Sequence, residues 1–196
     1  MKTLASLLLI MASSAFAGTP YAKNPKAPAL PPPDCPPISY SYAELGYIHQ
    51  QLDHLGHADG AFLDLSHTLV DKLFWEGSAT ITGGDVDFQS YGTGLGYAIP
   101  FVKHCDFVAR TGWSYSDSNR AGGEHEWYLS PGIRALVTCD LEFYAKAYYH
   151  VSEDENTWSG GVGFVYAVTP NVGLDLGGAI GEDGDWHAQF GIRYNF

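Results

Sequence analysis

The chain has 196 residues, a formal net charge of −12 at pH 7 and 45% hydrophobic residues. An acidic chain without a basic patch is atypical of nucleic-acid-binding proteins, so we exclude that class. After the N-terminal 17 residues, no stretch approaches the roughly 18 consecutive apolar residues that a transmembrane helix requires.

The first 17 residues have the three parts of a secretory signal peptide. Lys2 supplies the positive charge, an apolar run extends from Leu4 to Met11, and Ala15-Phe16-Ala17 forms the A-x-A cleavage motif. The apolar run is too short to span a bilayer as a helix. We therefore expect residues 1–17 to be removed on export.

Residues 18–38 form a Pro-rich segment that contains eight prolines. Proline disfavours both helix and sheet and favours an extended, semi-rigid chain. We interpret the segment as a periplasmic linker before the first strand; the alternative is a docking segment for a periplasmic partner.

From residue 39 to the end, the chain consists of segments of alternating hydrophobicity separated by breaks rich in turn residues. Short breaks alternate strictly with longer, polar and acidic ones, as in transmembrane barrels. The pattern predicts an all-β fold, a closed antiparallel transmembrane β-barrel of ten strands, with eight strands as the alternative. A soluble barrel or sandwich explains the long strands and their aromatic ends less well. The predicted strands are 39–50, 60–70, 73–82, 87–99, 106–116, 126–138, 141–151, 158–168, 172–181 and 186–196.

The last predicted strand has an apolar face and a polar face. Read with period two, Trp186, Phe190 and Tyr194 share the apolar face, which ends on Phe196. This segment resembles the C-terminal signal strand of bacterial outer-membrane barrels, and the resemblance implies that Tyr194 and Phe196 form an assembly signal. A single strand cannot leave its backbone groups unpaired in lipid, so the other strands should close a barrel with it.

Alternation also assigns the charged residues within the strands to the inner face. A charge facing lipid near the bilayer midplane costs roughly 2–4 kcal/mol for Arg or Lys, and unpaired buried charges are costly too, so these groups should interlock. We expect Arg134 to lie between the strands that carry Arg110 and the pair Glu142/Lys146, and Arg193 to lie beside Asp175. The network either plugs the lumen or lines a narrow path for ions or small solutes. Its members are Glu44, Asp64, Glu76, Arg110, Arg134, Glu142, Lys146, Asp175 and Arg193.

Two of the three cysteines flank one predicted hairpin. Cys105 precedes the fifth strand and Cys139 follows the sixth, so we expect them to be neighbours at the periplasmic rim. The periplasm is oxidising, which favours a Cys105–Cys139 disulfide. Cys35 in the Pro-rich segment is then left free, or pairs with a rim cysteine or a second molecule.

The expected outer mouth is rich in acids and histidines. It is interpreted as a solvated rim against lipopolysaccharide, as a surface that binds Mg²⁺ or Ca²⁺ through oxygens, or as a His–carboxylate site for Zn²⁺, Cu²⁺ or Ni²⁺. The sequence contains no G-x-S-x-G, phosphate-loop or H-E-x-x-H motif, and we expect no enzyme activity and no cofactor. The less favoured alternative is an outer-membrane enzyme that uses the acids and histidines of this rim. The histidines considered as metal ligands are His54, His57, His125 and His187.

Four segments at 42–47, 91–97, 131–135 and 168–174 resemble the OmpA/OmpX-like family of small outer-membrane β-barrel proteins. The resemblance implies residence in the outer membrane, contact with membrane lipid and lipopolysaccharide, and insertion by the barrel-assembly machinery. It implies an envelope-structural or surface-interaction role, with a narrow porin-like channel as the alternative. The Pro-rich segment and the Cys105/Cys139 pair depart from the family pattern.

Overall fold

The computed structural model describes residues 35–52, 56–119, 122–152, 156–182 and 184–196. The predicted signal peptide and residues 18–34 of the predicted Pro-rich linker lie outside these ranges. None of the described segments forms a helix that is long and apolar enough to cross a membrane.

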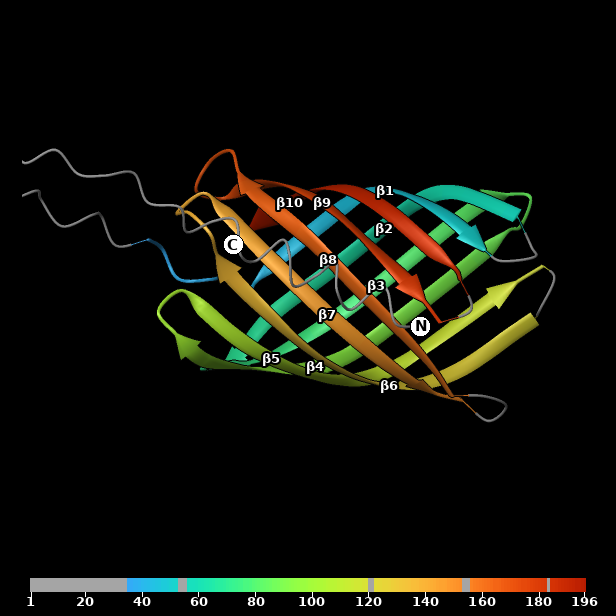
Figure 1. The fold of residues 1–196 in the computed structure, drawn as a ribbon, viewed down its shortest axis with the longest axis horizontal. Coiled ribbons are helices and arrows are strands. Elements are labelled where there is room, and N and C mark those ends of the chain that lie inside the picture. The colour runs from blue at the N-terminus through green and yellow to red at the C-terminus, as the bar shows by residue number, and fades with distance from the viewer. Residues whose placement is uncertain (1–34, 53–55, 120–121, 153–155, 183) are drawn as a thin grey trace, which may run out of the picture. The chain divides into compact units, whose positions relative to one another are not determined.

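Ten antiparallel strands close into a barrel in which sequential strands pair and β1 also pairs with β10 (Figure 1). The predicted ten-stranded closed barrel is therefore confirmed, and the eight-stranded alternative is wrong. The predicted segments match the observed strands to within a few residues at each end. The strands are β1 (Tyr42–Leu52), β2 (Gly56–Val70), β3 (Leu73–Gly84), β4 (Phe88–Val102), β5 (Cys105–Ser118), β6 (Gly122–Leu136), β7 (Leu141–Val151), β8 (Asn156–Ala167), β9 (Val172–Gly181) and β10 (Trp186–Asn195).

The two ends of the barrel differ in their connections. One end, here called the turn end, carries the short connections 71–72, 103–104, 137–140 and 168–171. The other end, the loop end, carries the remaining connections between strands. The amide of Phe196 donates to the carbonyl of Ser41 at 3.2 Å, so the end of β10 and the start of β1 meet at the turn end.

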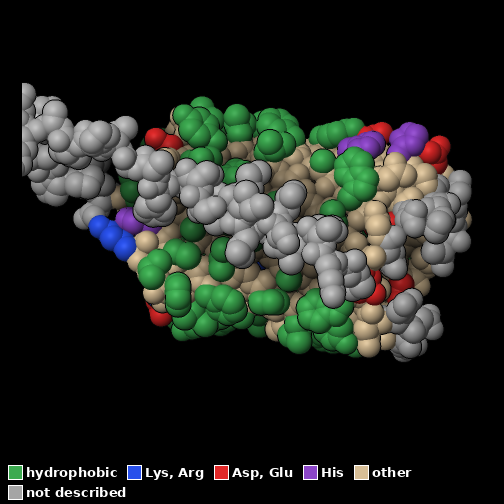
Figure 2. Space-filling model, in the orientation of Figure 1, with side chains coloured by type: hydrophobic (Ala, Val, Ile, Leu, Met, Phe, Trp, Pro, Cys, Tyr) green, Lys and Arg blue, Asp and Glu red, His purple; other side chains and the backbone are tan. Residues whose placement is uncertain are grey.

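Residues along each strand alternate between the outside and the inside of the barrel, as the period of a β-strand requires. On β10, for example, exposed residues alternate with half-buried and buried ones from Trp186 to Tyr194. Hydrophobic side chains cover much of the visible outer wall, and histidine and acidic side chains gather towards the loop end (Figure 2). The wall has the apolar exterior of a protein embedded in lipid. Its exposed hydrophobic residues include Leu45, Leu95, Trp127, Leu129, Val162, Leu176, Phe190 and Ile192.

An apolar cluster fills the interior near the turn end. Phe74, Ala98 and Val108 are almost completely buried there, and Tyr40 packs against them. Phe74 fits because β4 has a glycine beside it: a Cβ atom added at Gly96 would overlap the Phe74 ring. The missing side chain of Gly96 thus gives the ring its space inside the barrel.

Candidate lumen site

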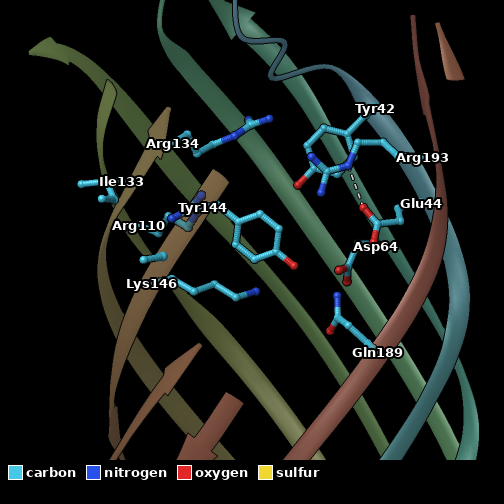
Figure 3. Close-up of a pocket in the computed structure, with 11 residues that line it drawn as sticks. Tyr42, Glu44, Asp64, Arg110, Ile133, Arg134, Tyr144, Lys146, Gln189 and Arg193 are labelled. Carbon is cyan, nitrogen blue, oxygen red and sulfur yellow. Dashed lines mark hydrogen bonds and ion pairs between the residues drawn. The ribbon is translucent and has the colours of Figure 1, made fainter. Parts of the chain in front are cut away.

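The interior carries the nine charged residues that the sequence assigned to the lumen. They come from eight of the ten strands, and Figure 3 shows several of them converging from opposite walls. Five of the nine are buried, with at most 9% of their surface exposed: Glu44, Arg134, Glu142, Asp175 and Arg193.

Arg134 on β6 is held by three groups. Its Nε and Nη2 donate to the two carboxylate oxygens of Glu142 on β7, at 2.6 and 3.0 Å, and its Nη1 donates to the carbonyl of Ser39 at 2.8 Å. Its guanidinium carbon also lies 4.6 Å from the ring centroid of Tyr40. The two-pronged contact is the geometry in which an arginine binds a carboxylate most strongly.

Arg193 on β10 bridges two acidic residues from the strands on either side. Its Nε lies 2.7 Å from Glu44 on β1, and its Nη2 lies 3.4 Å from Asp175 on β9. The guanidinium carbon lies 4.2 Å from the ring centroid of Tyr42. Asp175 in turn accepts a hydrogen bond from the Tyr144 hydroxyl at 3.1 Å. From the sequence, Arg134 was expected between the strands of Arg110 and of Glu142/Lys146, and its carboxylate partner there is Glu142. Arg193 was expected beside Asp175, and that contact occurs.

A third pair joins β3 and β5, which are not neighbours in the barrel. Arg110 Nε lies 3.3 Å from Glu76, and Glu76 also accepts a hydrogen bond from the Tyr128 hydroxyl at 2.9 Å. This ion pair therefore connects two strands through the lumen, past the intervening strand β4. Sequence reasoning did not select Tyr42, Tyr128 and Tyr144 as lumen residues, although alternation places each on the same face as a selected charge on its own strand.

A cavity of about 50 Å³ remains between these groups. Its lining includes Asp64, Lys146 and Gln189 as well as the paired residues Glu44 and Arg193. The second carboxylate oxygen of Glu44, Oε1, is buried without a hydrogen-bond partner. A small polar chamber thus lies between the paired groups.

The segment before β1 lies against the turn end of the lumen. Tyr40 stacks on Phe74, with ring centroids 4.8 Å apart, and its hydroxyl donates to Asp106 at 2.9 Å. Burial raises the pKa of the Tyr40 hydroxyl, which keeps it protonated as a donor to that carboxylate. Residues 35–41, which we call the strap, therefore contact the interior through Ser39 and Tyr40.

The predicted Cys105–Cys139 disulfide is wrong. Cys139 bonds instead to Cys35 in the strap, with Cα atoms 4.8 Å apart, and Cys105 is a free thiol. The register of the β5–β6 hairpin explains the difference: Cys105 pairs with Ala135, so Cys139 lies beyond the strand end in the next turn. The strap brings Cys35 to that turn.

The predicted assembly residues lie on the outer wall at the turn end. Tyr194 and Phe196 have 52% and 61% of their surface exposed. The Phe196 ring lies 6.1 Å from that of His67 on β2, across the seam where β1 and β10 close the barrel. Their positions suit contact with lipid; their part in assembly stays a prediction.

The four histidines proposed from the sequence as metal ligands do not form one site. His57 pairs with Asp85 at 2.8 Å, His125 packs between Trp113 and Tyr115, and His187 occupies an inward-facing position of β10. His54 lies outside the described residues. Within the described ranges, no group of three or more His, Cys, Asp or Glu side chains is arranged to hold a metal ion.

Among the comparisons with known proteins, the one with solved structures found proteins similar to this chain. No protein-family model matches it, and no curated protein sequence matches it. The NanC porin aligns over 80% of this chain and all of its own, with 8% identity and a TM-score of 0.52. The KdgM porin aligns over 78% of this chain and 99% of its own, at 15% identity and a TM-score of 0.48. Neisserial surface protein A aligns over 81% and 98%, at 18% identity and a TM-score of 0.43.

These identities are low, so the similarity concerns the fold, and NanC is the one of the three with a TM-score above 0.5. The comparison with NanC agrees with the closed antiparallel barrel. The fold of residues 35–196 is that of the small outer-membrane β-barrel proteins.

Proposed function

We propose that the protein is an outer-membrane barrel with a closed lumen, and that it serves the structure of the envelope or interactions at its surface. The observation that carries the proposal is the filling of the interior. Three arginines from three strands are each bound to carboxylates of other strands, and a cavity of about 50 Å³ remains between them. A cavity of this size has room for a few water molecules, too little for a solute path.

The strap supports closure at the turn end, which we expect to face the periplasm. It is covalently fixed by Cys35–Cys139, and Tyr40 fills the space beside Phe74. A solute that passed the charged network would therefore meet the Tyr40 and Phe74 rings next.

The loop end supplies the surface through which such a barrel would act. Its described acidic residues include Asp59, Asp85, Asp117, Glu124 and Glu182. Acidic oxygens at this level suit Mg²⁺ or Ca²⁺, which would connect the rim to the phosphates of lipopolysaccharide. We propose lipopolysaccharide as the neighbour of this rim.

Single-channel conductance in planar bilayers tests the closed lumen. The folded, unboiled protein is inserted, and its folding is checked by heat-modifiable migration on a gel, with a conducting porin as the positive control. We expect a silent bilayer. Discrete current steps that scale with salt concentration would replace the proposal with its alternative, a narrow channel. The chamber beside Lys146 is the observation that favours this alternative.

A further inference from the structure

Two histidines lie close together on the outer wall at the loop end, and each contacts an acidic side chain. His49 Nδ1 on β1 lies 2.7 Å from Asp59 Oδ1, and His57 Nδ1 on β2 lies 2.8 Å from Asp85 Oδ2. In the β1–β2 register His49 opposes Asp59, so His49 and His57 are diagonal neighbours on one face. Their ring centroids are 6.3 Å apart, and the Trp186 ring on β10 lies 5.4 Å from that of His49. The two histidine side chains are accessible, with 34% and 55% of their surface exposed.

The carboxylates determine which nitrogen of each ring can bind a ligand. A neutral imidazole that donates its Nδ1 proton to a carboxylate keeps a lone pair on Nε2. Histidines that bind metal ions almost always have such a partner, a carboxylate, carbonyl or water on the nitrogen that does not bind the metal. His49 and His57 both have this arrangement, with a carboxylate on Nδ1. Each ring can therefore offer Nε2 to a metal ion.

The two carboxylates are themselves held in place. Asp59 accepts a hydrogen bond from the Tyr47 hydroxyl. Asp85 accepts one from the backbone amide of His57 at 3.3 Å, and its own amide donates to the His57 carbonyl at 3.0 Å. The fold therefore orients both imidazole rings, which lowers the entropic cost of binding a ligand between them.

We propose that His49 and His57 bind one Zn²⁺ ion through their Nε2 atoms. Imidazole nitrogen suits Zn²⁺, whereas Mg²⁺ and Ca²⁺ prefer oxygen. Zn–N bonds of about 2.0–2.1 Å place two imidazoles on one ion with ring centroids roughly 5–6 Å apart. The observed 6.3 Å therefore requires only a small rotation of an exposed side chain. No third His, Cys, Asp or Glu of the described ranges completes the site, so water supplies the remaining ligands.

A zinc ion at this position would connect β1 and β2 through their side chains. β1 also pairs with β10, so the site lies beside the seam that closes the barrel. An ion that binds only the folded chain would stabilise the barrel there. The proposal goes beyond the envelope role, and it holds whether or not the lumen conducts.

Isothermal titration calorimetry of ZnCl₂ into the refolded, full-length barrel tests the site. The protein carries no histidine tag, is kept in a non-ionic detergent, and its folding is checked by heat-modifiable migration. We expect one Zn²⁺ per barrel with a Kd in the micromolar range, and the same Kd in an excess of Ca²⁺. Binding no tighter than millimolar would overturn the proposal. Displacement of Zn²⁺ by Ca²⁺ would overturn it too, because it would assign the binding to carboxylates.

Variants separate the histidine pair from other groups at the loop end, and the folding of each is checked in the same way. His49→Ala and His57→Ala each remove one ligand, so both should raise the Kd more than about tenfold. Asp59→Asn removes only the carboxylate behind His49 and should raise it about 10–100-fold. The matched control is His125→Ala, the same change at an exposed loop-end position of β6, which should keep the original Kd. An unchanged Kd in the double variant His49→Ala/His57→Ala would place the zinc elsewhere and refute the site.

Discussion

Loss of the Arg134 side chain should destabilise the fold. The change Arg134→Leu removes both hydrogen bonds to Glu142, the bond to the Ser39 carbonyl and the stacking on Tyr40. It leaves a buried carboxylate without a partner, for which we expect a loss of about 3–5 kcal/mol in the free energy of unfolding. Urea unfolding of the folded barrel, followed by tryptophan fluorescence, measures this loss.

The double variant Arg134→Leu/Glu142→Leu is the matched control for this prediction. Removing both partners leaves no unpaired charge, so we expect the double variant to recover much of the lost stability. Arg134→Leu alone should not conduct, because Arg193 with its partners and the strap remain in place. A stable single variant that passes ions would mean that this pair gates a pore.

The strap makes a prediction at the level of one element, because its position depends on the Cys35–Cys139 bond. The folded protein is denatured without a reducing agent, treated with maleimide and analysed by mass spectrometry. We expect one thiol, that of Cys105, to react. Reduction should raise the count to three. Cys105→Ser should give none before reduction, and Cys35→Ser should give two unless Cys105 then pairs with Cys139. Two reactive thiols in unreduced Cys105→Ser would contradict the observed pairing.

The strands could be predicted from the sequence, whereas the pairing of the cysteines could not. Alternation along each strand is a local signal, and it defined all ten strands together with the faces that Glu44 and Arg134 occupy. The cysteine pairing depends on the register of a hairpin and on where a Pro-rich segment runs. A register in which Cys105 opposes Ala135 moves Cys139 out of the strand, and no periodic pattern places Cys35.

The same contrast applies to the candidate site. Contacts between adjacent strands, such as Arg193 with Asp175, follow from strand order and could be expected from the sequence. The contact of Arg110 with Glu76 could not, since it crosses the lumen over an intervening strand and depends on the tilt of the closed barrel. The chamber is likewise a property of the packed interior, because it consists of the space that the paired side chains leave.

At the scale of the whole molecule, the distribution of apolar and charged side chains between the surface and the interior is the reverse of that in a soluble protein. Large apolar side chains such as Leu176 and Phe190 face outward, while Glu44, Asp175 and Arg193 are buried inside. The backbone groups of all ten strands pair around the closed ring, so no strand edge is left in contact with lipid. The stability of the molecule in a bilayer therefore depends on the apolar outer wall as much as on the charged interior.

The outer wall gives a prediction that separates a membrane-embedded barrel from a soluble one. Leu176 lies in the middle of β9, is 63% exposed and is flanked by Phe164 and Phe190 on the neighbouring strands. Leu176→Arg should lower the stability of the barrel in lipid vesicles by about 2–4 kcal/mol, because the charge lies near the bilayer midplane. The control Val168→Arg, at an exposed position of the turn end, should cost at most about 1 kcal/mol. Equal small effects of the two changes on folding into vesicles would mean that this wall does not face the hydrocarbon of a bilayer.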